Sequence, residues 1–196
     1  LAVIVGNLAV YGWLLFRTNQ GTDDHIRHKH LPEVVPHESV SVKGTVASKP
    51  RTIEGGHVLV DLEHARVRLT MAAYEPTKGF REIVRKLMPG DQVVAVGSVR
   101  DEPRTLNLEK LKVQSLGTQF AEVKLGNPRC PECGRSMKSA GLDAGFRCLR
   151  CGTRAGEDEA SIERHARDLE PGWYEVPPSA RRHLARPLKL GIGPNI

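Results

Sequence analysis

Apolar and polar residues alternate with a period of two through most of the segment between residues 38 and 116. Alternation of this kind is typical of half-buried β-strands, and it predicts strands around residues 40–46, 58–62, 67–71, 92–99 and 105–113. After the third run the period becomes that of a helix, with apolar residues at Phe80, Ile83, Val84, Leu87 and Met88. Pro89-Gly90 predicts the end of this helix.

The order of three strands, one helix and two strands matches the OB-fold, a five-stranded Greek-key barrel. We therefore expect a mainly β protein with some α, in which an OB-fold occupies residues 36–124. An OB-fold commonly binds oligonucleotides on its second and third strands. Basic residues that leave the predicted core are candidate phosphate contacts, namely Lys43, Arg66 and Arg68. The alternative is that these charges serve solubility, because acidic residues lie nearby.

Aromatic residues are scarce in this segment, which contains Tyr74, Phe80 and Phe120 and no other. Proteins that bind single strands without sequence preference usually stack several bases on aromatic side chains. The barrel is therefore better suited to a folded RNA, recognised through its shape and phosphates. A single-stranded DNA-binding protein of the replication protein A type, built from an OB-fold and zinc, remains an alternative.

Two Cys-x-x-Cys pairs follow the barrel and form the most specific motif in the chain. This paired spacing brings four thiolates onto one tetrahedral zinc ion, here from Cys130, Cys133, Cys148 and Cys151. Four protein ligands leave no open position for water, so we expect the zinc to be structural. The expected zinc ribbon spans residues 125–156 and includes Arg147, a candidate nucleic-acid contact. Two disulfides or an iron–sulfur centre are the alternatives.

Residues 1–16 are mostly apolar, but they are interrupted by glycine and asparagine and are shorter than the roughly 20 residues of a membrane span. No basic residue precedes them and no small-residue cleavage site follows, which argues against a signal peptide. We interpret residues 1–35 as the end of a preceding domain, with a buried strand or helix, followed by a linker. The linker includes the run from His25 to His30, because nothing in the sequence fixes its three histidines around a metal.

A polar stretch separates the apolar segment from the linker, with the sequence Arg17-Thr18-Asn19-Gln20-Gly21-Thr22-Asp23-Asp24-His25. A dense run of hydrogen-bonding groups directly after a buried element suits a loop that faces a ligand. An ordinary polar turn, in which side chains bond to the backbone, is the alternative.

The C-terminal segment, residues 157–196, is rich in charge and is broken by prolines. We expect a charged helix over 157–168 and a short helix over 180–186, capped by Ser179. The second helix offers candidate nucleic-acid contacts at Arg181, Arg182, His183 and Arg186. Such a helix could lie along a phosphate backbone. The alternative is that it packs against another domain, as part of a structural or interaction module.

The composition is that of a globular protein with a weak preference for polyanions. Lys and Arg number 29 against 23 Asp and Glu, which gives a net charge of +6. This balance favours a nucleic-acid partner without proving one. Hydrophobic residues at 39% and charged residues at 27% exclude a collagen, a coiled coil and a polytopic membrane protein, and we expect no membrane partner.

Four segments in this order resemble the archaeal tRNA-isoleucine 2-agmatinylcytidine synthetases. They are RTNQGTDDH, GTVASKPRTIEGGHV, CPECGRSMKSAGLDAGFRCLRCG and PGWYEVPPSARRHLARPL. The resemblance covers essentially the whole chain and corresponds to the C-terminal part of that family, without its catalytic kinase-like domain. It implies that the chain begins with the end of a ferredoxin-like domain. It also implies a substrate cleft lined by Arg17, Thr18, Asn19, Gln20, Thr22 and Asp23.

The resemblance further implies a function. Enzymes of this family are ATP-dependent ligases that attach agmatine to the wobble cytidine of the isoleucine tRNA with a CAU anticodon, which then reads AUA. The implied partners are this tRNA, with ATP and agmatine bound through the missing N-terminal domain, and the implied location is the cytoplasm. No residue of this chain can be named as the catalyst, so we expect the chain alone to bind tRNA without transferring agmatine.

Overall fold

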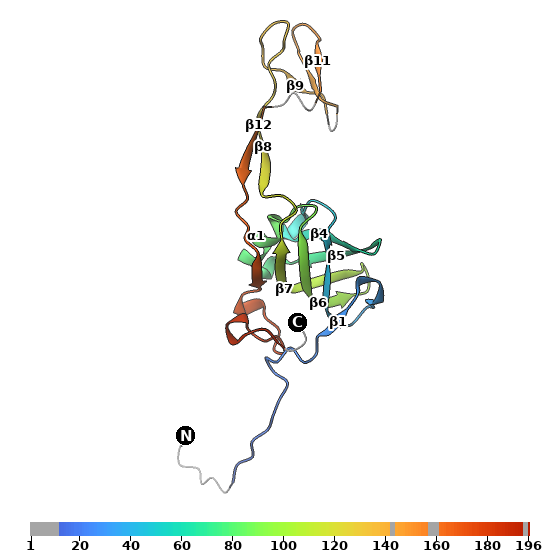
Figure 1. Ribbon diagram of the computed structural model, residues 1–196, viewed down its shortest axis with the longest axis vertical. Coiled ribbons are helices and arrows are strands. Elements are labelled where there is room, and N and C mark those ends of the chain that lie inside the picture. Colours follow the sequence, from blue (N-terminus) through green and yellow to red (C-terminus); the bar gives the residue numbers. More distant parts are fainter. Residues whose placement is uncertain (1–11, 142–143, 157–160, 194–195) are drawn as a thin grey trace.

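The computed structural model describes residues 12–141, 144–156, 161–193 and 196 (Figure 1). The molecule is elongated: a β-barrel lies in the middle, and a small ribbon projects from it on a two-stranded stem. The buried strand or helix expected within residues 1–16 lies largely outside the described residues. Residues 12–16 have no regular secondary structure, and the large side chains from Trp13 to Phe16 are exposed.

Five strands form the barrel: β2 (Ser39–Val46), β4 (Val58–His64), β5 (Val67–Ala73), β6 (Gln92–Arg100) and β7 (Thr105–Ser115). Their order is β2-β6-β7-β5-β4, and an additional pairing of β4 with β2 closes the barrel. The pairing of β5 with β7 is parallel, and the other pairings around the barrel are antiparallel. The predicted five-stranded barrel is therefore confirmed.

Alternate side chains of these strands fill the barrel, and the fully buried ones include Val60, Leu62, Met71 and Leu111. The helix α1 (Gly79–Arg85) packs its buried Phe80 and Val84 on this core. A 3-10 turn, η3 (Glu75–Thr77), precedes the helix. The helix lies between the third and fourth barrel strands as predicted, but it ends at Arg85 rather than near Met88.

Short strands extend the barrel sheet. β1 (Arg27–Lys29) pairs in parallel with β2, β3 (Arg51–Thr52) pairs with β4, and β13 (Gly172–Glu175) pairs with β7. The segment around β1, expected as a solvated linker, is therefore part of the fold. The flanking Ile26 and Leu31 are buried, and this burial holds the strand against the barrel. Further 3-10 turns are η1 (Leu31–Glu33), η2 (Glu54–Gly56), η5 (Pro178–Ala180) and η6 (Leu188–Leu190).

The stem consists of β8 (Phe120–Gly126), which leaves the barrel, and β12 (Ser161–Ala166), which returns antiparallel to it. At its far end, β9 (Lys138–Ser139), β10 (Phe146–Arg147) and β11 (Arg154–Ala155) form the ribbon sheet. The helix expected over residues 157–168 is wrong, because 161–166 form a strand and 157–160 lie outside the described residues. The segment has too few apolar residues to bury a helix face, whereas β8 supplies backbone hydrogen-bond partners.

The tail after β13 folds back onto the barrel without the helix expected over residues 180–186. The carbonyls of His183 and Leu184 accept hydrogen bonds from the N–H groups of Gly21 and Asp23, at 2.9 and 3.1 Å. These carbonyls are therefore bonded to a distant segment rather than to a following helical turn, and Pro187 prevents the segment from continuing as a helix. None of the helices in the described ranges is long and apolar enough to cross a membrane.

Candidate metal centre and nucleic-acid interface

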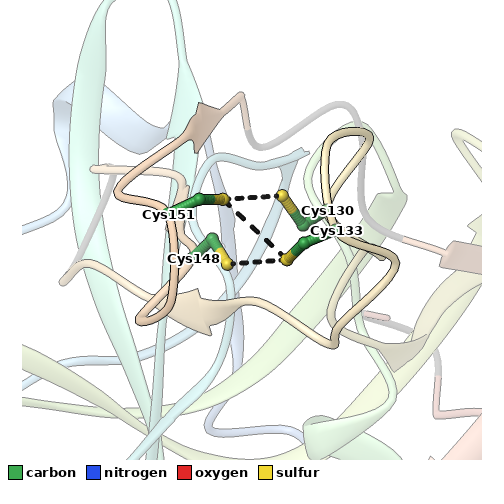
Figure 2. A group of neighbouring side chains, drawn as sticks. All are labelled: Cys130, Cys133, Cys148 and Cys151. Atoms are coloured by element: carbon green, nitrogen blue, oxygen red, sulfur yellow. Dashed lines mark hydrogen bonds between the residues drawn. The ribbon is translucent and has the colours of Figure 1, made fainter.

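The four cysteines converge in the ribbon (Figure 2). Their Sγ atoms all lie within 4.8 Å of one another. The Sγ–Sγ separation is 3.4 Å for Cys130 and Cys151, 3.5 Å for Cys133 and Cys148, and 3.8 Å for Cys133 and Cys151. A tetrahedral zinc ion with Zn–S bonds of about 2.3 Å needs sulfur–sulfur edges of about 3.8 Å, which these separations approach. The cysteines form no disulfide, so the cluster fits one tetrahedral metal.

Each cysteine pair lies on a turn with the same backbone hydrogen bonds. The N–H of Cys130 donates to the carbonyl of Arg135, and the N–H of Gly134 donates to the carbonyl of Cys130, both at 2.8 Å. The Cys148 turn repeats these two bonds at 2.8 and 3.0 Å. The glycine after each pair has a positive φ, 67° at Gly134 and 78° at Gly152, which other residues adopt only at a cost. The repeated turn explains why Cys-x-x-Cys-Gly occurs twice.

The sulfurs differ in their affinity for protons. Hydrogen bonds with the side chain and backbone of Thr153 lower the pKa of Cys151 to about 6. The backbone N–H of Arg135 lowers the pKa of Cys133, but hydrogen bonding to Cys148 and burial outweigh it and raise that pKa to about 11. Backbone hydrogen bonds from Cys151 and Arg150 lower the pKa of Cys148 as well, so two of the four sulfurs favour the thiolate, and their like charges repel at this distance. A divalent cation removes that repulsion, so the donor set suits zinc.

The cysteines also provide much of the core of the ribbon. Cys130 and Cys148 are buried together with Met137 and Phe146, and this cluster is separate from the barrel core. A core this small supplies little burial of apolar surface. We therefore expect the ribbon to depend on the metal for its stability.

Basic side chains surround the cysteine cluster. Five of the exposed ones form what we call the ribbon basic face, namely Arg135, Lys138, Arg147, Arg150 and Arg154. Two cavities of about 270 and 320 Å³ open among these residues, and both are lined by Lys138 and Leu149. The sequence candidate Arg147 lies in this face. The arrangement offers several cations to a polyanion over one end of the molecule.

The candidate phosphate contacts of the barrel are all exposed: Lys43 on β2, Arg66 in the turn between β4 and β5, and Arg68 on β5. The guanidinium of Arg68 donates to the carboxylate of Glu63 at 2.5 Å, so it is paired on its own hairpin. Arg68 also lines an open cavity of about 460 Å³ beside this hairpin. Lys43 and Arg66 are not among the residues that line it.

The polar loop and the C-terminal tail pack against each other, although they are far apart in sequence. The Asp23 carboxylate accepts a hydrogen bond from the N–H of Arg186 at 2.8 Å. Its other oxygen accepts one from Lys110 Nζ at 2.5 Å. The side chains of Asp23 and Lys110 are 0% and 3% exposed. Asp23, a candidate cleft residue, is therefore a buried contact between loop, barrel and tail.

The other loop candidates lie at the surface: Arg17, Thr18, Asn19 and Gln20 are exposed. The Thr22 hydroxyl donates to the carbonyl of Asn19 at 2.8 Å and accepts from the N–H of Asp24 at 3.3 Å. These side-chain-to-backbone bonds are those of a polar turn. The loop thus presents four polar side chains to solvent on a turn fixed at Thr22 and Asp23.

The arginines of the tail have partners within the chain. Arg181 and Arg182 donate to carboxylates of β13 and β7, in both cases at 2.9 Å. Arg186 donates to a carbonyl at the end of η6 at 2.6 Å. His183, the remaining tail candidate, is exposed. This arrangement is the one expected if the tail packs within the protein.

Comparison with known proteins identifies the family. The family described as "TiaS C-terminal zinc ribbon domain" matches residues 127–169. The tRNA 2-agmatinylcytidine synthetase TiaS of Methanocaldococcus jannaschii is 43% identical over 178 residues, which are 91% of this chain and 41% of that protein. The TiaS of Methanosarcina acetivorans is 47% identical over 198 residues, 100% of this chain and 44% of that protein. The chain belongs to the TiaS family.

Solved TiaS structures agree with this assignment. The crystal structure of a TiaS complex with its tRNA and ATP matches with a TM-score of 0.63 and 40% identity, over 91% of this chain and 40% of that one. The chain spans about two fifths of the length of the curated TiaS proteins that it matches. The match to the TiaS zinc ribbon continues beyond the last cysteine and includes β12, so the returning strand of the stem is part of that domain.

Two buried ion pairs of this TiaS family member were missed by sequence analysis. One is the pair of Lys110 with Asp23. The other joins Arg167, after the stem, to Asp91, before β6, with nitrogen–oxygen distances of 2.6 and 2.7 Å. Lys110 left a signal, because Glu109-Lys110 interrupts the alternation of β7 between two leucines. Arg167 left none, since its partner lies far away in sequence.

His25, which the sequence placed both at the end of the polar stretch and at the start of the linker, lies close to the charges of Glu109 and Arg182. Neither ring nitrogen has a hydrogen-bond partner within the described residues, and both atoms are buried. Burial lowers the pKa of His25, against the raising effect of the nearby Glu109 carboxylate. Neutral imidazole is therefore the favoured form in the folded protein.

Proposed function

We propose that this chain is the tRNA-binding part of an ATP-dependent ligase that attaches agmatine to the wobble cytidine of the CAU-anticodon isoleucine tRNA. The observation that carries the proposal is the 40% identity to a TiaS solved with its tRNA and ATP, over 91% of this chain. The ribbon basic face supports it, since phosphate contacts supply most of the affinity of such surfaces.

The remaining features extend this proposal. We infer that the segment before β1 ends a ferredoxin-like domain and that the OB-fold, expected at 36–124, also includes β1. The zinc ribbon, expected at 125–156, extends through the returning strand β12, and the tail follows it. The exposed part of the polar loop, Arg17 to Gln20, would then line the substrate cleft of the complete enzyme. ATP and agmatine would bind mainly to parts outside this chain, and the zinc is structural. The complete enzyme would act in the cytoplasm.

A binding experiment tests the proposal. We expect the isolated chain to bind a CAU-anticodon isoleucine tRNA transcript more tightly than poly-dT in gel-shift competition, with an affinity that falls as salt rises. Supplied with ATP and agmatine, the same chain should transfer no agmatine to the tRNA. Preference for poly-dT would favour the single-stranded DNA-binding alternative. Agmatine transfer would contradict the assignment of catalysis to other parts of the enzyme.

A second candidate, an interaction module, is favoured by one observation. Arg181, Arg182 and Arg186 donate to acceptors within the chain, so the tail has contacts to make without RNA. In this reading the tail holds the loop at residues 17–25 in place. A chain ending before Ser179 distinguishes the two. Unchanged tRNA affinity and salt slope favour the interaction role, whereas a reduced slope favours phosphate contacts.

A further inference from the structure

A groove lies where the stem joins the barrel. It has a volume of about 560 Å³, within the range of ligand sites, and it is lined by Lys49, Met88, Pro89, Thr118, Phe120 and Arg164. These residues come from the loop after β2, the turn after α1, the start of the stem and its returning strand. The groove therefore lies between the barrel and the stem, and neither of them forms it alone.

The groove contains an exposed aromatic ring. Of the three aromatic residues in the barrel segment, Phe80 is buried and Tyr74 packs edge-on against His57, with ring centroids 5.0 Å apart. Phe120 differs from both, because it is 53% exposed. A half-exposed ring next to apolar neighbours such as Met88 offers one open face for stacking.

Two cations flank this ring. Lys49 is exposed on the barrel side, and Arg164 is exposed on the stem side. An aromatic surface between two cations matches a nucleotide, whose base stacks while its phosphates meet positive charge.

The walls of the groove are held in place by the Arg167–Asp91 pair. Asp91 accepts hydrogen bonds from the N–H of Met88 at 2.8 Å and from the N–H of Gly117 at 3.0 Å. Arg167 donates to the carbonyl of Thr118 at 3.0 Å. The turn that carries Met88 and the segment that leads to Phe120 are thus fixed to one buried ion pair. Groove residues that are already ordered before binding lose less conformational entropy when a ligand binds.

We propose that this groove binds an unpaired nucleotide of the RNA, with the base stacked on Phe120 and the adjacent phosphates contacting Lys49 and Arg164. The inference rests on the proposed function in one respect, namely that the chain binds RNA. The groove adds a second RNA contact at the junction of barrel and stem, so that an RNA bound to the ribbon basic face would also contact this junction. A protein segment is the competing occupant, but an apolar segment would cover Lys49 without offering it a counter-charge.

The test compares Phe120 variants of the full chain in binding to the tRNA transcript. Phe120→Ala should weaken binding by roughly 5- to 160-fold, the range of one base stacked on an aromatic ring. The salt slope should stay unchanged, because no charge is removed. Phe120→Tyr should bind like the wild type, and Phe120→Leu, which keeps apolar bulk, should bind like Phe120→Ala. Val35→Ala, at another exposed apolar position, is the matched control and should have no effect.

The cation is tested separately. Lys49→Gln should weaken binding and reduce the magnitude of the salt slope by about one. Irradiation of a transcript carrying 5-iodouridine should crosslink the peptide that contains Phe120. If the wild type binds tRNA and Phe120→Ala binds it as well as Val35→Ala does, this inference is overturned while the proposed function stands. Crosslinks to other peptides only would have the same meaning. If Phe120→Ala keeps its tRNA affinity but no longer binds another part of the synthetase, the groove is a protein interface and the nucleotide proposal is overturned. Failure of the wild type to bind tRNA instead rejects the proposed function.

Discussion

At the scale of single residues, Arg167 connects three parts of the chain. Its guanidinium pairs with Asp91 and also donates to the carbonyls of Lys86 and Thr118, at 2.8 and 3.0 Å. Both charged side chains are at most 3% exposed. A buried carboxylate and guanidinium compensate for their lost hydration only while they remain paired. The pair is therefore sensitive to the loss of either partner.

We predict that Arg167→Met destabilises the protein by about 3–5 kcal/mol, because it leaves the Asp91 carboxylate buried without a cation. Urea unfolding at neutral pH measures the change. Asp168→Asn is the matched control, since it breaks an ion pair one residue further on in which Asp168 is largely exposed. It should change stability little. Equal effects of the two variants would contradict the role given to the buried pair.

His25 makes stability depend on pH. The pKa of His25 is lower in the folded protein than its ordinary value of about 6.5. As the pH falls below that value, the unfolded chain binds a proton at His25 before the folded protein does, and this favours unfolding. The contribution of His25 is therefore complete above that pH and is lost as the pH falls through the folded pKa. We predict that His25→Phe reduces the loss of stability between neutral and mildly acidic pH. Urea unfolding at both pH values measures it. His28→Gln, at an exposed position, should keep the wild-type loss, and an identical loss in His25→Phe would disprove the prediction.

At the scale of elements, what the sequence could reveal depends on where the partners of each element lie. The barrel strands and the cysteine turns were predictable, because period-two alternation and Cys-x-x-Cys-Gly spacing are local patterns. The strand β12 and the irregular tail were not, since their hydrogen-bond partners are β8 and the loop at Gly21 and Asp23. The same holds within the candidate site. Spacing identified the cysteines, whereas the Phe120 groove arises only when four separate segments meet.

The ribbon and the barrel should respond differently to loss of metal. The ribbon core consists of Cys130, Met137, Phe146 and Cys148, and it shares no residue with the barrel core. We predict that a strong chelator, or the variant Cys148→Ser, unfolds the ribbon and leaves the barrel folded. Amide NMR spectra should lose the dispersed signals of the ribbon alone, and metal analysis should find one zinc per untreated chain. Ser139→Ala is the control. An unchanged ribbon spectrum after zinc removal would contradict the prediction.

At the scale of the whole molecule, basic residues occur at both ends, but they differ in whether they are bonded to other groups of the chain. Those of the ribbon basic face are exposed around the cysteine cluster, whereas the tail arginines are bonded within the chain. Charge that is already neutralised by an internal carboxylate releases fewer counterions when RNA binds. The ribbon end should therefore dominate the electrostatic part of the affinity.

We predict that the double variant Arg147→Gln/Arg150→Gln weakens tRNA binding and lowers the magnitude of the salt slope by roughly two. Arg181→Gln should leave the slope unchanged, because Arg181 is paired with Glu175 at 2.9 Å. Binding measured at several salt concentrations gives both slopes. The reverse result, with a reduced slope only in Arg181→Gln, would place the phosphate contacts on the tail.

The two strands of the stem allow the metal-binding module to be exchanged. Phe120 and Ala166 stand opposite each other at its base, so everything between them enters and leaves the barrel at a single point. The metal-binding module is thus an insertion with adjoining ends, and a tight hairpin turn could replace it without moving the barrel strands. Modules of other lengths could be grafted at the same place, which makes the length of the projecting module separable from the stability of the barrel.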